Sequence, residues 1–458
     1  MTTNTAADHQ HQPGTGRQLT LNAFLLNVGH HEAAWRHPRT DPHAPADVQH
    51  FIELARIAER AKLDSIFFAD GLALWNDIRY NATLRYEPIT LLSAIAQATT
   101  HIGLIATAST TYYHPYLLAR AFASLDHLSR GRAGWNIVTS ASDAEAANFG
   151  LDAQVPHAER YARAAEFVDV VTRLWDSWDD DALVLDQAAG VYADPDKVHA
   201  VDHVGERFTV AGPLNVPRPP QGHPVLVQAG SSEDGKEFAA RYAEAVFTAQ
   251  RSLADGQAFY ADLKGRLSRY GRSPDQIKIL PGISPVLGST EAEALRLLDE
   301  LDELTSPEYG LNQLAGMTGL DLRGLSLDDP LPTDLPGEQT VTGQQSRYSL
   351  VLDLARREKL TIRQLLRRLA GGRGHRVFAG TPEQVADELQ LWFDNGAADG
   401  FNVMAPLLPG GLEDFTTQVV PILQARGLFR TEYPGTTLRD TYGLARPAAR
   451  HDPAPAQA

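Results

Sequence analysis

Apolar runs of strand length alternate with amphipathic helical stretches along most of this chain, and this alternation constrains the fold most strongly. The first pair is an apolar run at residues 19–27 and a helical pattern at 47–62, where Phe51, Leu54 and Ala58 recur at helical spacing. Strand–helix pairs in series predict a parallel sheet with right-handed crossovers. About eight such pairs follow one another, which predicts an α/β fold, a (β/α)8 TIM barrel with insertions.

The expected strands are short apolar runs, and the expected helices begin at Pro or at a capping residue where the sequence offers one. The strands cover residues 19–27, 65–70, 102–108, 130–140, 224–228, 245–248, 277–286 and 400–405. The helices cover residues 47–62, 88–99, 115–128, 157–175, 253–270, 290–304, 381–395 and 412–426, and one more begins after Gly230. Thr381 and Gln384 predict a capping box at the start of one helix.

Two segments interrupt this alternation. Residues 178–222 are acidic and then rich in Gly and Pro, which predicts an excursion carrying a hairpin around Phe208. Residues 305–345 are irregular, and so long a loop in a compact domain is usually a lid or a binding insertion. We therefore expect one barrel over residues 18–446 with insertions at about 178–222 and 305–375, and disordered tails at 1–17 and 447–458.

The composition excludes several classes of protein. A net charge of -16 argues against nucleic acid or an anionic membrane as the main partner. The chain has no cysteine, which excludes disulfides, thiolate catalysis and Cys-ligated metals. No apolar run approaches the ~20 residues of a membrane span. The polar first 17 residues lack the pattern of a signal peptide, so we expect a cytoplasmic protein.

In a (β/α)8 barrel the site lies at the C-terminal ends of the strands, so the polar and aromatic residues found there are the candidates. They are Asn27, His30 and His31 after the first strand, Asp70 and Trp75 after the second, Thr107, Ser109 and Tyr112 after the third, Asn136, Thr139 and Ser140 after the fourth, and Gln228, Gly230, Ser231 and Ser232 after the fifth.

The fourth strand, residues 130–140, combines two glycines with an amide. Gly131 and Gly134 carry no side-chain bulk, so another backbone or a flat ligand can come close. Asn136 stands in an apolar run, and a buried amide must find hydrogen-bond partners. These partners are either neighbouring backbone groups or a ligand, and the spacing alone does not decide between them.

Two helix starts leave similar alternatives. Ser231 and Asp234 form a capping box, but the free N–H groups of the same turn also favour an anion, against which the Asp234 carboxylate counts. His157 and Tyr161 lie four residues apart on one helix face and can meet one ligand together. The alternative for Tyr161 is a buried tyrosine with its hydroxyl bonded inside the core.

Motifs for protein-based chemistry are missing. The histidines at 30, 31 and 37 have no acidic or cysteine partner at a ligand spacing, so we expect no metal. No G-x-G-x-x-G fingerprint or G-x-S-x-G elbow occurs. A cofactor is therefore the expected reagent. Phe68, Trp75, Tyr112 and Trp135 are suited to line the dry pocket that such a reagent needs.

Long segments of the chain resemble a known family. The run at 115–129 leads into Gly-Arg-Ala-Gly-Trp-Asn-Ile-Val-Thr-Ser at 131–140, and both are similar to the flavin-dependent nitrilotriacetate and dibenzothiophene-sulfone monooxygenases of the bacterial luciferase-like superfamily. The resemblance covers about residues 19–446 and is weakest at 178–205 and 305–375. It includes the segments at 29–38, 68–70, 159–161, 228–232, 380–384, 426–430 and 435–439.

The resemblance implies an FMNH₂-dependent monooxygenase on a (β/α)8 barrel. A separate NAD(P)H:flavin reductase would supply FMNH₂, and O₂ would form a flavin C4a-(hydro)peroxide that oxidises a small organic substrate. A transient contact with that reductase and a homodimer or homotetramer are expected. By resemblance, Asp70, Thr107, Asn136, His157, Tyr161, Gly230, Ser231 and Ser232 would bind FMN. His31 and His375 would serve catalysis on the substrate side, where Phe68, Trp75 and Tyr112 would also lie.

Two other functions remain open on the same barrel. One is a deazaflavin-dependent oxidoreductase that transfers hydride without oxygen, and the other is a non-catalytic flavin-binding protein. The candidate residues are mostly aromatic and neutral, which favours an aromatic or heteroatom-containing substrate over a polycarboxylate, since the latter would require several Arg or Lys.

Overall fold

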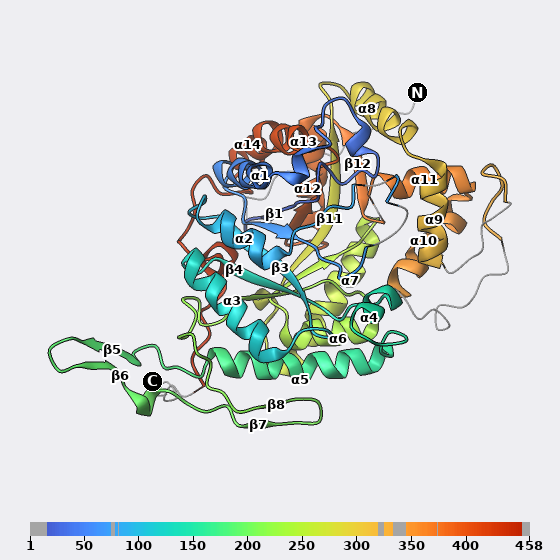
Figure 1. Cartoon of the computed structure of the whole chain (residues 1–458). Coiled ribbons are helices and arrows are strands. Elements are labelled where there is room, and N and C mark those ends of the chain that lie inside the picture. The colour runs from blue at the N-terminus through green and yellow to red at the C-terminus, as the bar shows by residue number, and fades with distance from the viewer. Residues whose placement is uncertain are drawn as a thin grey trace.

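Eight parallel strands close into a barrel in the computed structural model (Figure 1), as the alternation predicts. The structure describes residues 16–74, 78–80, 82–318, 325–332, 345–372 and 374–450. The barrel strands are β1 (Thr20–Phe24), β2 (Ser65–Phe68), β3 (Gly103–Ser109), β4 (Ala133–Val138), β9 (Val225–Gln228), β10 (Ala245–Thr248), β11 (Lys278–Leu287) and β13 (Gly400–Val403). Trp75 and most of the two predicted tails lie outside the described residues.

The long strand β11 closes the barrel. Its first residues pair with β10, where Ala245 lies opposite Lys278, and its middle pairs with β13, where Gly282 lies opposite Asn402. The second half of β11 pairs with a ninth strand, β12 (Arg376–Gly380), in the short apolar run after His375. This pairing places the segment that precedes β12 beside the second half of β11.

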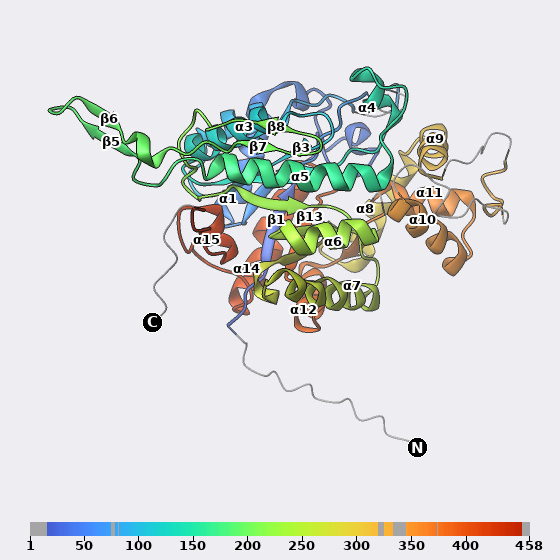
Figure 2. The ribbon, with the colours of Figure 1, turned by 90° about the horizontal axis from the view of Figure 1, so that it is seen from below.

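Helices surround the barrel (Figures 1 and 2), and most begin where the sequence predicts them. They are α1 (Val48–Arg60), α2 (Pro88–Ala96), α3 (Pro115–Ser129), α4 (Asp143–Asn148), α5 (His157–Trp175), α6 (Glu233–Tyr242), α7 (Leu253–Arg266), α8 (Glu291–Glu303), α12 (Pro382–Asp394), α13 (Gly410–Asp414), a π-helical turn (Phe415–Val419), α14 (Val420–Ala425) and α15 (Leu438–Tyr442). The predicted capping box at Thr381 and Gln384 is present. Between strands and helices lies a large apolar core that includes Trp135, Phe167 and Trp175.

The excursion after α5 carries two hairpins. One joins β7 (His203–Val204) to β8 (Thr209–Val210) around Phe208, as predicted, and Phe208 packs on Phe167 of α5. The other joins β5 (Leu183–Asp186) to β6 (Val191–Ala193) and projects away from the barrel in both views (Figures 1 and 2).

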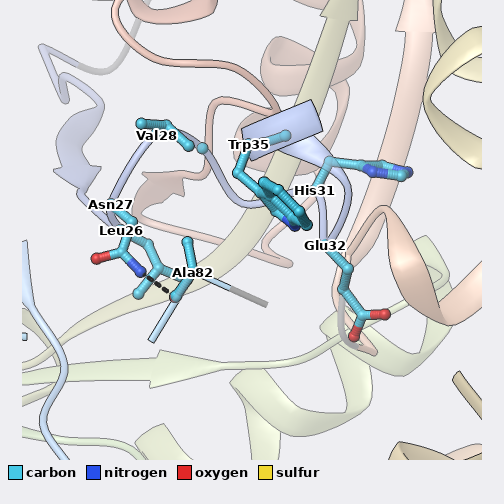
Figure 3. A pocket seen from close by; sticks show the side chains of 9 residues that line it. Leu26, Asn27, Val28, His31, Glu32, Trp35 and Ala82 are labelled. Atoms are coloured by element: carbon cyan, nitrogen blue, oxygen red, sulfur yellow. Dashed lines mark hydrogen bonds between the residues drawn. The ribbon is translucent and has the colours of Figure 1, made fainter. Parts of the chain in front are cut away.

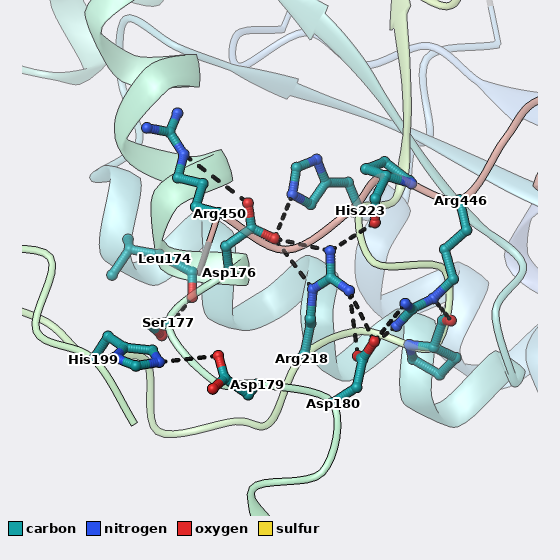
Figure 4. A network of polar contacts seen from close by, with 12 residues as sticks. Leu174, Asp176, Ser177, Asp179, Asp180, His199, Arg218, His223, Arg446 and Arg450 are labelled. Carbon is teal, nitrogen blue, oxygen red and sulfur yellow. Dashed lines mark hydrogen bonds and ion pairs between the residues drawn. The ribbon is translucent and has the colours of Figure 1, made fainter. Parts of the chain in front are cut away.

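Charged residues tie this excursion to the end of the chain (Figure 4). Arg218 is bonded to the buried carboxylate of Asp176 at 3.1 Å and to Asp180, which also pairs with Arg446. Arg218 also donates to the carbonyl of Pro447. These contacts hold the segment that follows α15 against the barrel.

The described residues between 305 and 375 form a lobe with its own small core, and one expectation for this region is wrong. Residues 305–345 were predicted to be irregular, but α9 (Pro307–Thr318) is a helix, followed later by α10 (Gln345–Glu358) and α11 (Ile362–Ala370). Gly310 weakens the helical pattern in the sequence because glycine disfavours helix interiors. A Cβ at Gly310 would lie 3.2 Å from Leu366, so the glycine allows α9 to pack closely on α11.

The short helix α15 closes the N-terminal end of the barrel. Leu438 and Tyr442 belong to the apolar cluster inside the barrel, with Phe24, Phe67 and Ile105. A Cβ at Gly134 would lie 3.2 Å from Leu438, and one at Gly131 would lie 2.9 Å from Thr437. The two glycines of the fourth strand therefore make room for the side chains of Thr437 and Leu438 at the start of α15, and the flat-ligand alternative is wrong for them.

Polar side chains beside this closing helix are bonded to one another. Tyr442 donates to Asn22 Oδ1 at 3.0 Å, and Ser65 donates to the same oxygen at 2.8 Å. Asn22 Nδ2 donates to Asn402 Oδ1 at 3.1 Å, and Asn402 Nδ2 donates to the Leu280 carbonyl at 3.1 Å. This end of the barrel is thus closed and its polar side chains are satisfied.

We predict that Leu438→Ala destabilises the protein by about 2–5 kcal/mol, because a fully buried leucine leaves a cavity between α15 and the strands. Equilibrium urea unfolding measures the change. The control is Leu128→Ala, a helical leucine that is 52% exposed and should cost roughly 0.5 kcal/mol or less. Equal losses for the two variants would contradict a sealing role for α15.

Candidate active site

An unpaired amide oxygen marks the open end of the barrel. Thr107 on β3 donates its hydroxyl proton to the Phe68 carbonyl at 2.8 Å, so its oxygen can only accept from Asn136, at 2.9 Å on β4. The Asn136 amide must therefore present Nδ2 to Thr107. Its Oδ1 is buried and has no hydrogen-bond partner among the residues that the structure describes. A ligand with an N–H group would satisfy it.

Two more buried polar atoms at this end lack partners within the described part of the chain, namely Gln228 Oε1 on β9 and Ser284 Oγ on β11. At the closed end the comparable amides of Asn22 and Asn402 are bonded to each other. Buried polar groups are almost always satisfied, so unpaired ones call for an explanation. The difference between the two ends points to a ligand at the open end.

The start of α6 lies beside the unpaired amide of Gln228. Ser232 caps this helix by accepting from Gly235 N at 3.1 Å, and its side chain also hydrogen-bonds Tyr161. The predicted capping box of Ser231 with Asp234 is therefore wrong, because the N-cap is Ser232, one residue later. A Cβ at Gly230 would lie 2.3 Å from Gln228 Nε2 and 3.0 Å from the Tyr161 hydroxyl, so Gly230 leaves room for both side chains beside the turn.

The side chains around this helix start converge as the spacing predicts. The rings of His157 and Tyr161 lie 5.0 Å apart on α5. His157 Nδ1 is 2.9 Å from Asp234 Oδ2, within hydrogen-bond distance of this carboxylate beside the turn. Ser231 does not cap the helix, and its hydroxyl lies 3.3 Å from Thr248 Oγ1 at the end of β10. Burial raises the pKa of Tyr161, so its hydroxyl remains a neutral donor.

Asp70 follows β2 at the same end of the barrel and is partly buried. Burial raises the pKa of its carboxyl, and the nearby carboxylates of Glu87 and Glu145 raise it further. The Gly71 N–H and the Arg85 charge oppose this rise.

His31 lies in a loop after β1 that lines a small pocket with Asn27, Glu32, Trp35 and Ala82 (Figure 3). Its Nδ1 accepts from Ala33 N at 3.2 Å, and its Nε2 faces Asp302 Oδ1 of α8 at 3.2 Å. Both ring nitrogens are thus engaged within the protein. A role for His31 in catalysis on the substrate side stays a prediction.

His375 has a different setting. It ends the lobe segment just before β12, and its ring stacks on Phe247 of β10 with 4.8 Å between centroids. A Cβ at Gly282 would lie 2.5 Å from His375 Nδ1, so the imidazole lies against β11 as well. The lobe therefore places this histidine over the interior of the barrel.

The predicted aromatic lining is dispersed. Phe68 packs outward on Phe51 of α1, with 5.7 Å between the ring centroids. Trp135 packs outward among the helices, against Trp175. Their rings are on the wrong face of their strands for the predicted pocket. Tyr112 is partly buried and stacks on Phe149 at 4.3 Å.

Two polar residues were not selected from the sequence. Ser284 was overlooked inside an apolar strand, although it follows Gly282 at the inward-facing spacing of two. Arg160 is 2% exposed on α5 and donates to the Ser140 carbonyl, which holds a backbone with φ of 51° after β4. The sequence shows that Arg160 is next to Tyr161, but it does not show the contact of Arg160 with the Ser140 carbonyl.

Within the described ranges no group of three or more His, Cys, Asp or Glu could hold a metal ion. No helix in that part of the chain is both long and apolar enough to cross a membrane.

Comparison with known proteins identifies the family. The model of the luciferase-like monooxygenases matches residues 30–399. The chain belongs to the luciferase-like monooxygenase family. Nitrilotriacetate monooxygenase component A of Aminobacter aminovorans is 51% identical over 95% of this chain and 98% of that protein. Dibenzothiophene-sulfone monooxygenase of Rhodococcus erythropolis is 45% identical, covering 95% and 99% of the two chains.

A solved structure agrees with the fold. Riboflavin lyase with modified FMN and riboflavin has a TM-score of 0.82 and 33% identity, covering 93% of this chain and 96% of that one. The predicted family, the TIM barrel and the assignment as a flavin-dependent monooxygenase are thereby confirmed.

We predict that Asp70→Asn stabilises the free protein near pH 7. The pKa of Asp70 is higher in the folded protein than its unfolded value of 3.8, so at pH above 3.8 the ionised carboxyl lowers the free energy of unfolding. This cost vanishes at lower pH, where the carboxyl is protonated in both the folded and the unfolded protein. The gain should therefore shrink as the pH falls toward 3.8. Urea unfolding at several pH values measures it, with exposed Asp152→Asn as the control. A gain that does not depend on pH would contradict burial of the charge.

Proposed function

We propose that this monooxygenase is the oxygenase component of a two-component system. It takes up FMNH₂ from a separate NAD(P)H:flavin reductase and uses O₂ to oxidise a small organic substrate. The unpaired Oδ1 of Asn136 is the observation that carries this proposal, because a buried acceptor beside a fixed Thr107 hydroxyl suits the ring N–H of a flavin. The Aminobacter relative is named as component A of its monooxygenase, which supports the two-component arrangement.

The start of α6 suits the phosphate of FMN. A helix N-terminus after a glycine presents free N–H groups to an anion. The hydroxyls of Ser231, Ser232 and Tyr161 lie around this turn, and His157 pairs with the carboxylate of Asp234 that would otherwise repel a phosphate. Asp70, Thr107 and Asn136 would hold the ring system at the neighbouring strand ends.

Bound reduced flavin supplies the electrons that activate O₂, and the product gains one oxygen atom while the other leaves as water. The work left to the protein is to fix the ring, exclude water and position the substrate. The strand ends would fix the ring through Asn136 and Thr107, which are hydrogen-bonded to each other. His375, on the lobe side, would contact the substrate as a hydrogen-bond donor to developing negative charge.

Two other functions have less support. A deazaflavin-dependent hydride transfer would leave O₂ unused, and no feature of the site favours it over oxygen chemistry. A non-catalytic flavin-binding protein has no need for His375 to be placed over the interior of the barrel.

We predict that Ser231→Ala combined with Tyr161→Phe weakens FMN binding by roughly 10-fold or more, because each change removes a hydroxyl that would bond a charged phosphate. Riboflavin, which lacks the phosphate, should bind the variant as it binds the unchanged protein. Fluorescence titration with both flavins measures this. Ser268→Ala with Tyr192→Phe, two exposed positions, is the matched control. Equal losses for FMN and riboflavin would exclude this turn as the phosphate site.

We also predict that turnover consumes O₂ in proportion to product. FMN, NADH and a generic flavin reductase are supplied with a panel of substrates, and product is read by its mass under oxygen-18 gas. One heavy oxygen atom should enter the product. Product formation without oxygen uptake would favour hydride transfer instead.

A further inference from the structure

Arg251 is a cation that the reaction described so far does not use. It follows β10 by three residues and directly precedes Ser252, the N-cap of α7. Its Nη1 is buried and has no hydrogen-bond partner among the described residues, whereas its carbonyl accepts from Arg376 at 2.9 Å. The residue is thus fixed by its backbone while part of its guanidinium remains unsatisfied.

The charges around Arg251 leave a positive excess. Those that act on it come from Asp255 of α7 and from Arg357, Glu358 and Arg368 of the lobe. Glu358 pairs with Arg368 at 3.1 Å, and Asp255 lies 3.9 Å from Arg357 and accepts from the Ser252 hydroxyl. Each nearby carboxylate is therefore engaged with another group.

The helix that follows adds to this excess. The N-terminus of α7 carries the positive end of its dipole, which disfavours a cation at the position of Arg251. An unpaired, partly desolvated guanidinium in such a place destabilises the free protein. An anionic group delivered between β10 and the lobe would remove both costs.

We infer that Arg251 binds a carboxylate of the substrate and makes this enzyme select anionic substrates. This inference rests on the proposed function, since it places the substrate at the same end of the barrel. A guanidinium can bond a carboxylate with two parallel N–H groups, which fixes its orientation. The aromatic preference drawn from the sequence is weakened, because two of the aromatic side chains predicted to line the pocket, Phe68 and Trp135, face outward.

The FMN phosphate is the other source of an anionic oxygen, and the surroundings favour the substrate. The strongest charge effects on Arg251 come from Arg357, Glu358 and Arg368 of the lobe and from Asp255 of α7. The lobe also delivers His375, the residue proposed for the substrate side. Arg251 thus belongs with the substrate-facing elements.

The test measures binding without reduced flavin or oxygen, so its result does not depend on the proposed oxidation. Calorimetry compares methylthioacetate, iminodiacetate and nitrilotriacetate with their uncharged amides on the FMN-loaded protein. The unchanged enzyme should bind at least one carboxylate better than its amide. Arg251→Gln should weaken that carboxylate by roughly 10- to 100-fold and leave the amide unaffected, and Arg251→Lys should fall between.

The control variant is Arg363→Gln, which removes an exposed lobe arginine that pairs with Asp328 and should change nothing in binding. In the free protein Arg251→Gln should raise Tm, because an unpaired charge is removed, whereas a structural role would lower it. The inference is wrong if no carboxylate is preferred over its amide or if Arg251→Gln does not reduce the preference. It is also wrong if the variant loses affinity for FMN but not riboflavin, which would assign Arg251 to the phosphate.

Discussion

The closure of eight parallel strands is the constraint on which the rest of the molecule depends. In a closed parallel ladder every strand ends on the same side, so residues far apart in sequence must meet there. The pairing of β3 with β4 sets Thr107 beside Asn136, and the pairing of β9 with β4 sets Gln228 beside Ile137. Since β11 closes the ring and extends beyond it, β12 and His375 are carried to the same side.

The two ends of this barrel use similar residues in opposite ways. At the closed end, Asn22, Asn402 and Tyr442 form a bonded set beneath α15. At the open end, Asn136 and Gln228 each keep a buried acceptor without a partner in the described part of the chain. A buried acceptor without a hydrogen bond lowers the free energy of unfolding by about 1–3 kcal/mol. The free protein therefore carries a cost at the end where a ligand can relieve it, and the closed end supplies stability.

Much of the fold followed from patterns that are local in sequence. The helix from His157 to Trp175 has a clear apolar stripe and was predicted with the observed bounds. The alternation of side chains along a strand also shows which residues can face the same side, and the prediction of an aromatic lining did not take this into account. Trp135 and Asn136 are neighbours on β4, and neighbours on a strand face opposite sides, so they could not both face the ligand. The same parity separates Phe67, inside the barrel, from Phe68, outside it.

Other features depend on contacts between distant segments and could not be read from the sequence. The helix α9 is stabilised by packing Gly310 on Leu366, although the glycine argues locally against a helix. The contact of His31 Nε2 depends on Asp302, which lies 271 residues away in the sequence. The sequence does not show that Arg251 lacks an acidic partner, because this depends on Glu358 and Asp255 lying next to other arginines.

The division between barrel and lobe separates the two tasks of the enzyme. The residues proposed for FMN stand on strands and helix starts of the barrel, whereas His375 and most of the charges around Arg251 come with the lobe. The lobe packs around its own core of Leu314, Val351 and Leu365, so its outer contacts can change without disturbing the strand ends. In the proposed function, the barrel would therefore hold the flavin, and the lobe would select the substrate.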